Sequence, residues 1–382
     1  MKHLSHFEVR SFRNVRPTKL EFRPGLNVVL GKNAAGKTSL LNLLEESLTV
    51  FASGVEEERS VSFGLVDESA RLGRSIVRSR SKQIDPRGLP VFSNRDGFDI
   101  EIGQLRTTAE IGDGEMKIGA ETKQVGEGSF LALLTALKKY ANEDLFRFVK
   151  MVLTHTARLD ESLEYFDRLL GFWQTRVGTE VKNSLAVGRP RSLEKFEVSL
   201  GDSGPFFVVK FLDKAARVMG YDSAEARVDV ATKTTGSVVE TQFSNLRFAF
   251  RSGADQFFHS SLSYGEKRLL AFLAMSDASE IVIVDELING LHHEWIEACL
   301  SEIGERQAFL TSQNPLLLDY LEFESAEDVR RGFVLCSREK TEAGATEIVW
   351  RNPTADEAKE FFAAYETGLQ SVSEILISKG FW

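Results

Sequence analysis

The chain has 382 residues, of which 42% are hydrophobic and 27% charged, a composition typical of globular proteins that excludes wholesale disorder. At about 150 residues per domain, this length predicts two or three structural units. The net charge of −9 argues against nonspecific coating of nucleic acid by the whole surface. The two cysteines cannot form a disulfide framework, which favours a cytoplasmic protein, and the lack of an apolar run of about 18 residues argues against a membrane span.

The first fifty residues alternate between strand and helix signals. Short strands are predicted over 7–10 and 19–22. Residues 26–30 (LNVVL) form a nearly continuous apolar run, which indicates a buried central strand. A glycine-bearing loop follows, and the leucines between Ser39 and Val50 then recur at helical spacing.

The loop at residues 31–38 reads GKNAAGKT and fits the phosphate-binding pattern G-x-x-x-x-G-K-[ST]. Its glycines let backbone amides turn inward around a β-phosphate, and the following helix presents its free N–H groups to the same anion. Lys37 is predicted to reach the β- and γ-phosphates and the Thr38 hydroxyl to ligate Mg²⁺. A purely structural turn is disfavoured, because the loop follows a buried strand and precedes a helix. The predicted nucleotide-binding residues here are Gly31, Ala34, Ala35, Gly36, Lys37, Thr38 and Ser39.

Short strands and turns from about residue 55 to 125 predict a small antiparallel β lobe. This lobe contains a basic stretch. Its cations are Arg71, Arg74, Arg78, Arg80, Lys82 and Arg87. Arg78, Arg80 and Lys82 share parity and would point to one face of a strand, which fits a stripe that contacts DNA or RNA phosphates. We favour a solvated β face or a partner surface over this nucleic-acid contact, and no interleaved aromatic residues support base stacking.

The middle of the chain changes character. Residues 128–185 repeat apolar side chains at helical spacing without a sustained heptad, which predicts a helical insert rather than a long coiled coil. Strand and helix signals alternate again from residue 256. We therefore divide the chain into an N-terminal part with the β lobe (1–125), the insert with its return strands (126–255) and a C-terminal part (256–382).

Residues 262–268 read LSYGEKR and precede an apolar helical period. Ser263 is predicted as the N-cap of this helix, and Glu266, three residues later, completes a capping box. Taken alone, the segment would be an ordinary capped helix.

Residues 281–284 (IVIV) predict a buried strand that ends in Asp285 and Glu286. An acid at such a strand end can hold Mg²⁺, and a second acid can orient or deprotonate the attacking water. Asp285 is therefore predicted as a metal residue and Glu286 as a catalytic one. An aliphatic strand followed by two acids is a weak indication of a nucleotide site by itself, but its occurrence in the same chain as the phosphate loop makes it a specific one. The adjacent histidines 292 and 293 lack the i,i+4 spacing of helical zinc sites, which favours loop or structural roles.

The phosphate loop, the LSYGE segment and the aliphatic strand with two acids, in this order, resemble the motifs of ABC-type ATPases. Further segments resemble the SMC/RecF-like branch, including compact OLD-type (overcoming-lysogenization-defect) phage-defence ATPases without a Toprim domain. These segments are Phe12-Arg13-Asn14-Val15, Asn33, Asn289-Gly290-Leu291-His292, Ser312-Gln313-Asn314-Pro315 and residues 373–376 and 380–382. The resemblance covers residues 1–50 and 255–382 well and the middle only loosely.

The resemblance implies an α/β ABC-ATPase head, a P-loop NTPase mixed sheet with an antiparallel β lobe and a helical insert. It implies that Arg13 and Asn33 contact the nucleotide, and that Ser263 and Gly265 contact the γ-phosphate of ATP bound to the opposite subunit. Gln313 stands where the family has a switch histidine, and because glutamine cannot become a cation we expect slower hydrolysis or a longer-lived ATP-bound state. Candidates for the family's Mg²⁺-sensing glutamine are Gln83, Gln104 and Gln124.

We therefore expect an ATPase that uses ATP and Mg²⁺ and closes two copies of itself around the nucleotide. One role that fits is the regulatory ATPase of an anti-phage defence system that controls a separate effector such as a nuclease. The other is a DNA-repair or chromosome-maintenance ATPase that binds DNA directly. A transporter head is disfavoured by the long insert, and an in-chain nuclease by the lack of a Toprim-like acidic cluster after residue 320.

Overall fold

The computed structural model divides the chain into two compact units, each with helices and strands. The described residues are 2–49, 58–67, 70–84, 90–102, 105–112, 115–118, 121–124, 143, 146–147, 149–150, 152, 158–159, 175–178, 199–201, 204–207, 210–235, 238–312, 315–342 and 344–381. Unit 1 consists of Met1–Thr156 and Glu305–Trp382, and unit 2 is Ala157–Gly304. These boundaries differ from those of the three sequence segments, which stay a prediction.

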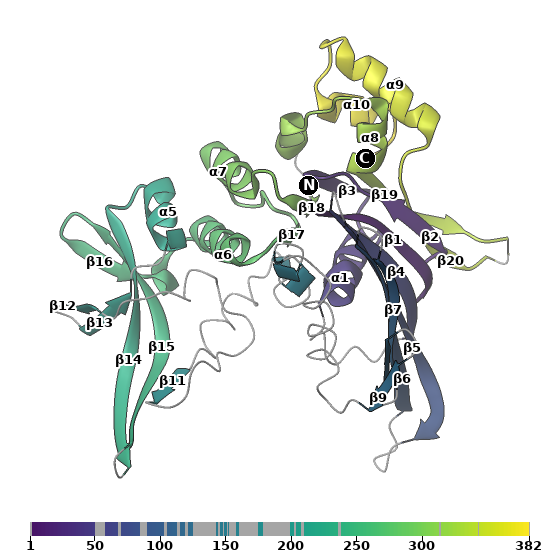
Figure 1. The fold of residues 1–382 in the computed structure, drawn as a ribbon. Helices are drawn as coiled ribbons and strands as arrows, with labels where there is room; N and C mark the ends of the chain where they lie inside the picture. Colours follow the sequence, from purple (N-terminus) through teal and green to yellow (C-terminus); the bar gives the residue numbers. More distant parts are fainter. Residues whose placement is uncertain are drawn as a thin grey trace. The chain divides into compact units, whose positions relative to one another are not determined.

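Unit 1 contains a long antiparallel sheet in the strand order β2-β1-β4-β5-β6-β7-β8-β9 (Figure 1). Its strands are β1 (His3–Phe12), β2 (Thr18–Glu21), β4 (Arg59–Asp67), β5 (Ala70–Ile84), β6 (Pro90–Ile102), β7 (Leu105–Gly112), β8 (Glu115–Ile118) and β9 (Glu121–Gln124). From β4 onward each strand pairs with the next, which confirms the antiparallel lobe predicted for residues 55–125.

A second group of strands in unit 1 positions the phosphate loop. The strand β3 (Leu26–Leu30) lies between β18 (Gln307–Thr311) and β19 (Phe333–Lys340) and runs parallel to both. β20 (Thr346–Arg351) pairs antiparallel with β19, so this is a mixed sheet, as predicted. The apolar run of β3 is buried, as expected for a central parallel strand whose faces are covered, and the C-terminal helices cover the face that carries Val28 and Leu30. The loop and α1 (Lys37–Leu48) follow it directly.

The α1 helix buries the leucines whose spacing predicted it. The leucines with no exposed surface are Leu40, Leu41, Leu43, Leu44 and Leu48. Burying each contributes about 1.5–3 kcal/mol. Near the end of the helix, Glu46 accepts a hydrogen bond from Nη1 of Arg59 at 2.6 Å, and the carbonyl oxygen of Ser47 accepts one from Nη1 of Arg74 at 2.8 Å. Two arginines of the β lobe therefore hold α1.

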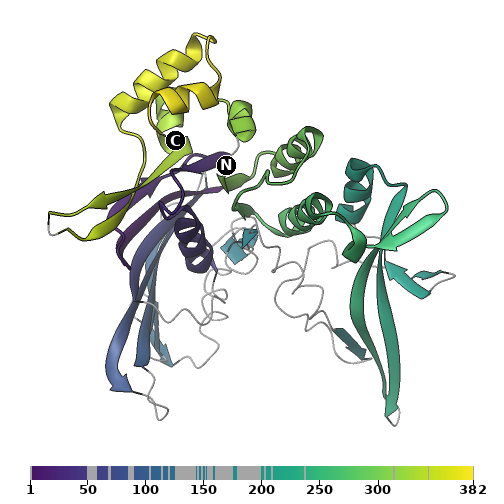
Figure 2. The same ribbon diagram turned by 180° about the vertical axis from the view of Figure 1, so that it is seen from behind.

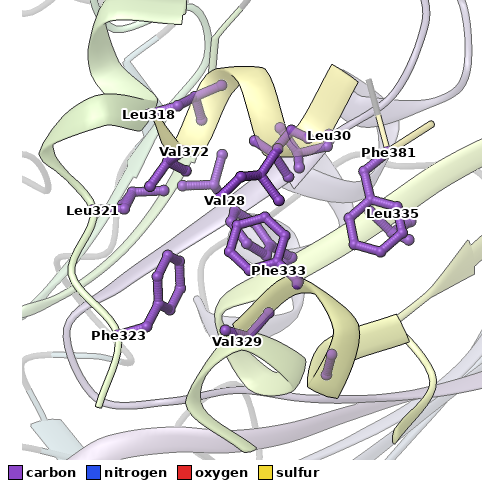
Figure 3. Close-up of a cluster of buried hydrophobic side chains, with 14 residues drawn as sticks. Val28, Leu30, Leu318, Leu321, Phe323, Val329, Phe333, Leu335, Val372 and Phe381 are labelled. Carbon is purple, nitrogen blue, oxygen red and sulfur yellow. The ribbon is translucent and has the colours of Figure 1, made fainter. Parts of the chain in front are cut away.

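The C-terminal helices cover β3 and β19 with an aromatic core (Figure 3). They are α8 (Ala326–Gly332), α9 (Ala355–Glu366) and α10 (Val372–Ser378), with the 3₁₀ turn η3 (Pro315–Tyr320). Phe361 makes edge-to-face contacts with Phe323 at 5.6 Å and with Phe333 at 5.5 Å between ring centroids. Both ribbon views place these helices at one end of unit 1, opposite the far end of the β lobe (Figures 1 and 2).

Unit 2 is built around the hairpin of β14 (Ser223–Thr235) and β15 (Val238–Ser252). Its sheet has the order β11-β15-β14-β13-β12, with β16 paired to β15. The shorter strands are β11 (Thr175–Gly178), β12 (Ser199–Gly201), β13 (Gly204–Phe207) and β16 (Asp255–Phe258). The helix α5 (Lys210–Met219) packs on β14.

The remaining elements of unit 2 carry the motifs of the second half of the chain. They are η2 (His259–Ser261), α6 (Tyr264–Ala278), β17 (Ile281–Val284), α7 (His293–Ile303) and β10 (Arg158–Leu159), which runs parallel to β17. Most of the predicted helical insert lies outside the described residues, and those described as helical there are 143, 146, 147, 149, 150 and 152. The helical prediction is wrong for β10 and β11, which lie within residues 128–185 and pair with other strands. Within the described part of the chain, no helix is long and apolar enough to span a bilayer.

Candidate nucleotide site

The phosphate loop uses backbone conformations that favour glycine. Gly31 has φ 143° and Gly36 has φ 92°, both in a region that L side chains rarely adopt. A Cβ on Gly31 would lie 2.3 Å from the carbonyl oxygen of Cys336, and one on Gly36 would lie 2.9 Å from Cγ2 of Ile348. The loop therefore lies directly against β19 and β20, with no room for a side chain at either glycine.

Lys37 lies across this loop. Its side chain is buried, and Nζ donates to the carbonyl oxygens of Gly31 at 2.7 Å and Lys32 at 3.3 Å. The first turn of α1, residues 37–40, contains no acid, so nothing there opposes the positive end of the helix. Phosphate oxygens can replace the two carbonyl acceptors. Asn33, Ala34 and Thr38 are exposed at this loop, whereas Ala35 is buried and Ser39 is half-buried.

Arg13 lies in the turn after β1, with a left-handed φ of 46°. Its guanidinium lies 4.9 Å from the centroid of the Phe12 ring, and Phe12 contacts Trp350 at 6.3 Å between ring centroids. The indole nitrogen of Trp350 would be 3.2 Å from a Cβ on Gly36. The segment that resembles the family's nucleotide-contacting turn is therefore anchored to the strand behind the phosphate loop.

Cys336, whose carbonyl contacts Gly31, is not a reactive thiol. Burial raises the pKa of Cys336 to about 12, although Lys37 opposes this shift. The thiol is therefore protonated at neutral pH, and the role of this residue at the loop is steric.

The LSYGE segment begins α6 with the predicted capping box. Ser263 Oγ accepts from the N–H of Glu266 at 3.4 Å, and Glu266 Oε2 accepts from the N–H of Ser263 at 2.8 Å. The Glu266 carboxylate also accepts a hydrogen bond from the Tyr221 hydroxyl. Burial, together with this carboxylate, raises the pKa of Tyr221 to about 12. The hydroxyl therefore stays a donor, and Ser263 itself is exposed at the helix N-terminus.

The LSYGE segment (residues 262–266) and residues 289–292 (NGLH) approach each other closely at two glycines. A Cβ on Gly265 would lie 2.3 Å from the carbonyl oxygen of Gly290, and a Cβ on Gly290 would lie 2.9 Å from Cδ1 of Tyr264. Gly290 also has a positive φ of 75°. These segments lie apart in sequence, and their close approach explains why each carries glycine.

The predicted acids Asp285 and Glu286 are buried at the end of β17, 7% and 6% exposed. Glu286 has φ 53°, which is uncommon for a residue with a side chain and costs about 1–3 kcal/mol. The fully buried Arg268 of α6 holds this turn: its Nη2 donates to the carbonyl oxygens of Asp285 and Glu286, each at 2.6 Å. No sequence motif predicts this role of Arg268, and the one signal for it is a cation next to the apolar run of α6.

The side chains described in unit 2 supply too few ligands to bind Mg²⁺ alone, so a bound Mg²⁺ would also need phosphate oxygens as ligands. Asp285 offers hard carboxylate oxygens, and a cation, Arg158, already lies 3.7 Å from Oδ2. Among the described residues, no group of three His, Cys, Asp or Glu residues could hold a metal ion. His292 precedes α7 and packs edge-on against Trp295 at 5.0 Å, a contact that fits the predicted structural role.

The prediction that Arg74 belongs to an exposed basic stretch is wrong. This side chain is buried and pairs with Asp96 at 2.7 Å, as well as binding α1. The even-numbered face of β5 is the inner one at this point, since Leu72 and Ile76 are also buried. Arg74 is therefore not available to DNA. Arg71 is exposed on the opposite face.

Several predicted residues cannot be placed. The residues Gln313, Gln104 and Arg87 lie outside the described residues, as do the side chains of Arg80, Lys82, Gln83 and Gln124. Arg78 is half-buried.

Comparisons with known proteins identify the class. An "AAA domain" family model matches residues 4–170, and a model described as "AAA domain, putative AbiEii toxin, Type IV TA system" matches residues 213–319. The DNA replication and repair protein RecF of Streptococcus pneumoniae strain CGSP14 is 49% identical over 41 residues, 11% of this chain and 11% of RecF. The match thus spans about a tenth of that relative.

Two solved structures were also compared. The SMC head bound to the C-winged helix domain of ScpA is 12% identical, with a TM-score of 0.38 over 92% of this chain and 98% of that chain. The recombination mediator protein RecF-ATPrS is 12% identical, with a TM-score of 0.36 and the same coverage.

The phosphate loop, the capped LSYGE helix and the two AAA-domain matches define an ATP-binding P-loop protein of the ABC type. The motifs of the chain, and the 41-residue stretch in which it is similar to RecF, resemble the SMC/RecF-like branch of these ATPases.

Proposed function

We propose that the chain hydrolyses ATP with Mg²⁺ in the cytoplasm. The proposal rests on Lys37, whose buried ammonium donates to Gly31 and Lys32 across a loop that leads into the N-terminus of α1. A cation and a helix N-terminus directed at one loop form an anion site. The triphosphate of ATP has the charge and the acceptor oxygens that such a site takes.

Each predicted residue has a distinct task in this reaction. Lys37 and the amides of residues 31–38 hold the β- and γ-phosphates, Thr38 and Asp285 hold Mg²⁺, and Glu286 polarises the attacking water. Mg²⁺, when bound, neutralises charge on the phosphate oxygens. Arg268 supports this arrangement because it fixes the backbone that carries both acids. The slower hydrolysis expected from Gln313 stays a prediction.

A second copy completes the site in this proposal. Ser263 is exposed at the start of α6, and the adjacent Tyr264 is 47% exposed, so the helix N-terminus is accessible to another molecule. In the ABC-type ATPases, the corresponding serine contacts the γ-phosphate held by the opposite subunit. We therefore propose a homodimer that closes around two ATP molecules and opens after hydrolysis.

For the biological role we favour a regulatory ATPase of anti-phage defence that controls a separate effector such as a nuclease. The description of the second matched model, a putative AbiEii toxin of a type IV TA system, supports a role in such systems. The alternative is a DNA-repair or chromosome-maintenance ATPase, which the RecF match supports. Burial of Arg74 weakens this alternative because it removes one cation from the proposed DNA stripe.

Hydrolysis and dimer closure are tested on the wild type, Glu286→Gln and Lys37→Ala. We expect Glu286→Gln to bind ATP like the wild type while turnover falls at least about 100-fold, because only the group that polarises water is lost. Lys37→Ala should lose ATP binding. Phosphate release per molecule should rise with protein concentration in the wild type. Normal turnover by Glu286→Gln would refute its role, and activity independent of concentration would refute dimer closure.

A further inference from the structure

The pairing of two short strands brings Arg158 next to Asp285. β10 runs parallel to β17 with Arg158 opposite Ile283, and the N–H of Asp285 donates to the carbonyl oxygen of Leu159 at 2.9 Å. Side chains alternate along a strand, so Asp285, two residues beyond Ile283, projects on the same face as Arg158. Nη1 of Arg158 accordingly lies 3.7 Å from Oδ2 of Asp285.

This ion pair is largely withdrawn from water. The side chain of Arg158 is 15% exposed and that of Asp285 is 10% exposed. A guanidinium keeps its proton at physiological pH, and a buried carboxylate is costly unless a cation lies beside it. The 3.7 Å between Nη1 of Arg158 and Oδ2 of Asp285 is longer than a hydrogen bond, so this contact neutralises charge without the oriented bonds of a bidentate arginine–carboxylate pair.

We propose that Arg158 is the counter-ion of Asp285 in the metal-free protein and that Mg²⁺ displaces it when nucleotide binds. This rests on the proposed function, in which Asp285 holds Mg²⁺. Either cation can balance the same carboxylate, but only Mg²⁺ can also take phosphate oxygens as ligands. Two cations at one buried carboxylate repel each other. Arg158 is therefore a positioning residue that raises the Mg²⁺ concentration required for nucleotide binding.

The first experiment measures binding of a fluorescent ADP analogue to the full chain across a Mg²⁺ titration. In Arg158→Gln, the Mg²⁺ concentration at half-maximal binding should fall by about three- to tenfold, the effect of removing a coupled neighbouring charge. Arg158→Lys keeps the charge and should behave like the wild type. An unchanged or higher Mg²⁺ requirement in Arg158→Gln, or loss of binding at saturating Mg²⁺, would overturn the proposal.

A second measurement separates this inference from the proposed function. In EDTA without nucleotide, Arg158→Gln removes a cation beside the buried Asp285 carboxylate, so the melting temperature of this variant should fall below that of the wild type. Asp285→Asn in the same chain should restore it. A double variant no more stable than Arg158→Gln contradicts the counter-ion role. A wild type that binds no nucleotide at any Mg²⁺ concentration refutes the proposed function instead, and the EDTA result still decides the role of Arg158.

Discussion

At the level of single residues, Gly31 is constrained by a neighbouring strand as well as by its own turn. A Cβ there would lie 2.3 Å from a backbone oxygen, that of Cys336, which cannot rotate away as a flexible side chain can. Gly25 provides a contrast: it also has a positive φ, 79°, but no described atom lies within 4 Å of its Cβ position. A side chain at either glycine would therefore strain the backbone, and only at Gly31 would it also cause a steric clash.

We predict that Gly31→Ala weakens ATP binding at least about tenfold, because the loop must move away from β19 and from Lys37 to relieve the clash. Gly25→Ala is the matched control, since it introduces strain without the clash. It should retain the ATP affinity of the wild type. Equilibrium binding of ATP in Mg²⁺ measures the effect, with thermal melting to show that both variants are folded. Equal affinities for the two variants would mean that contact with Cys336 does not shape the loop.

At the level of elements, α1 is supported at both ends. Its N-terminus follows the loop that lies against β19 and β20, and its last turn is held by Arg59 and Arg74 of the β lobe. Lys37 is the first residue of this helix. A helix moves largely as a rigid body, so the contacts at its last turn help to fix the position of the Lys37 ammonium.

We predict that Arg74→Met lowers the free energy of unfolding by about 2–4 kcal/mol, because it leaves Asp96 and the Ser47 carbonyl without their buried partner. Arg71→Met, on the exposed face of the same strand, should change it by less than about 0.5 kcal/mol. Urea denaturation of both variants measures the difference. If the two substitutions cost the same, the contacts of Arg74 do not stabilise the lobe against α1.

Local patterns in the sequence were sufficient for the elements next to the motifs. The apolar run 26–30 coincides with β3, and the capping box at Ser263 begins α6. Contacts between segments that are distant in the sequence leave no such local pattern. Arg74 looked like part of a basic surface because nothing nearby in sequence shows that Asp96 and α1 enclose it. The same limit hid the roles of Arg268 and Arg158, whose partners belong to other elements.

At the level of the whole molecule, surface charge distinguishes the two proposed biological roles. The net charge of −9 disfavours binding to DNA unless cations are concentrated on one surface. The basic stretch of β5 supplied that surface in the DNA-repair alternative, and Arg74 no longer belongs to it. The two proposed roles therefore differ in whether the remaining cations of this strand contact DNA.

If the defence role is right, changing Arg78 and Arg80 together to Glu should leave DNA binding unchanged, because in that role these two arginines contact no DNA phosphate. Affinity for duplex DNA is measured over a salt series with and without ATP, since each lost phosphate contact lowers the slope of log affinity against log salt by about one. Arg71→Glu changes a cation on the outer face of β5, so it tests DNA binding by that face separately from binding by the inner face. A salt slope about two units shallower in the double variant, together with loss of ATP-stimulated binding, would instead assign this chain to DNA repair or chromosome maintenance.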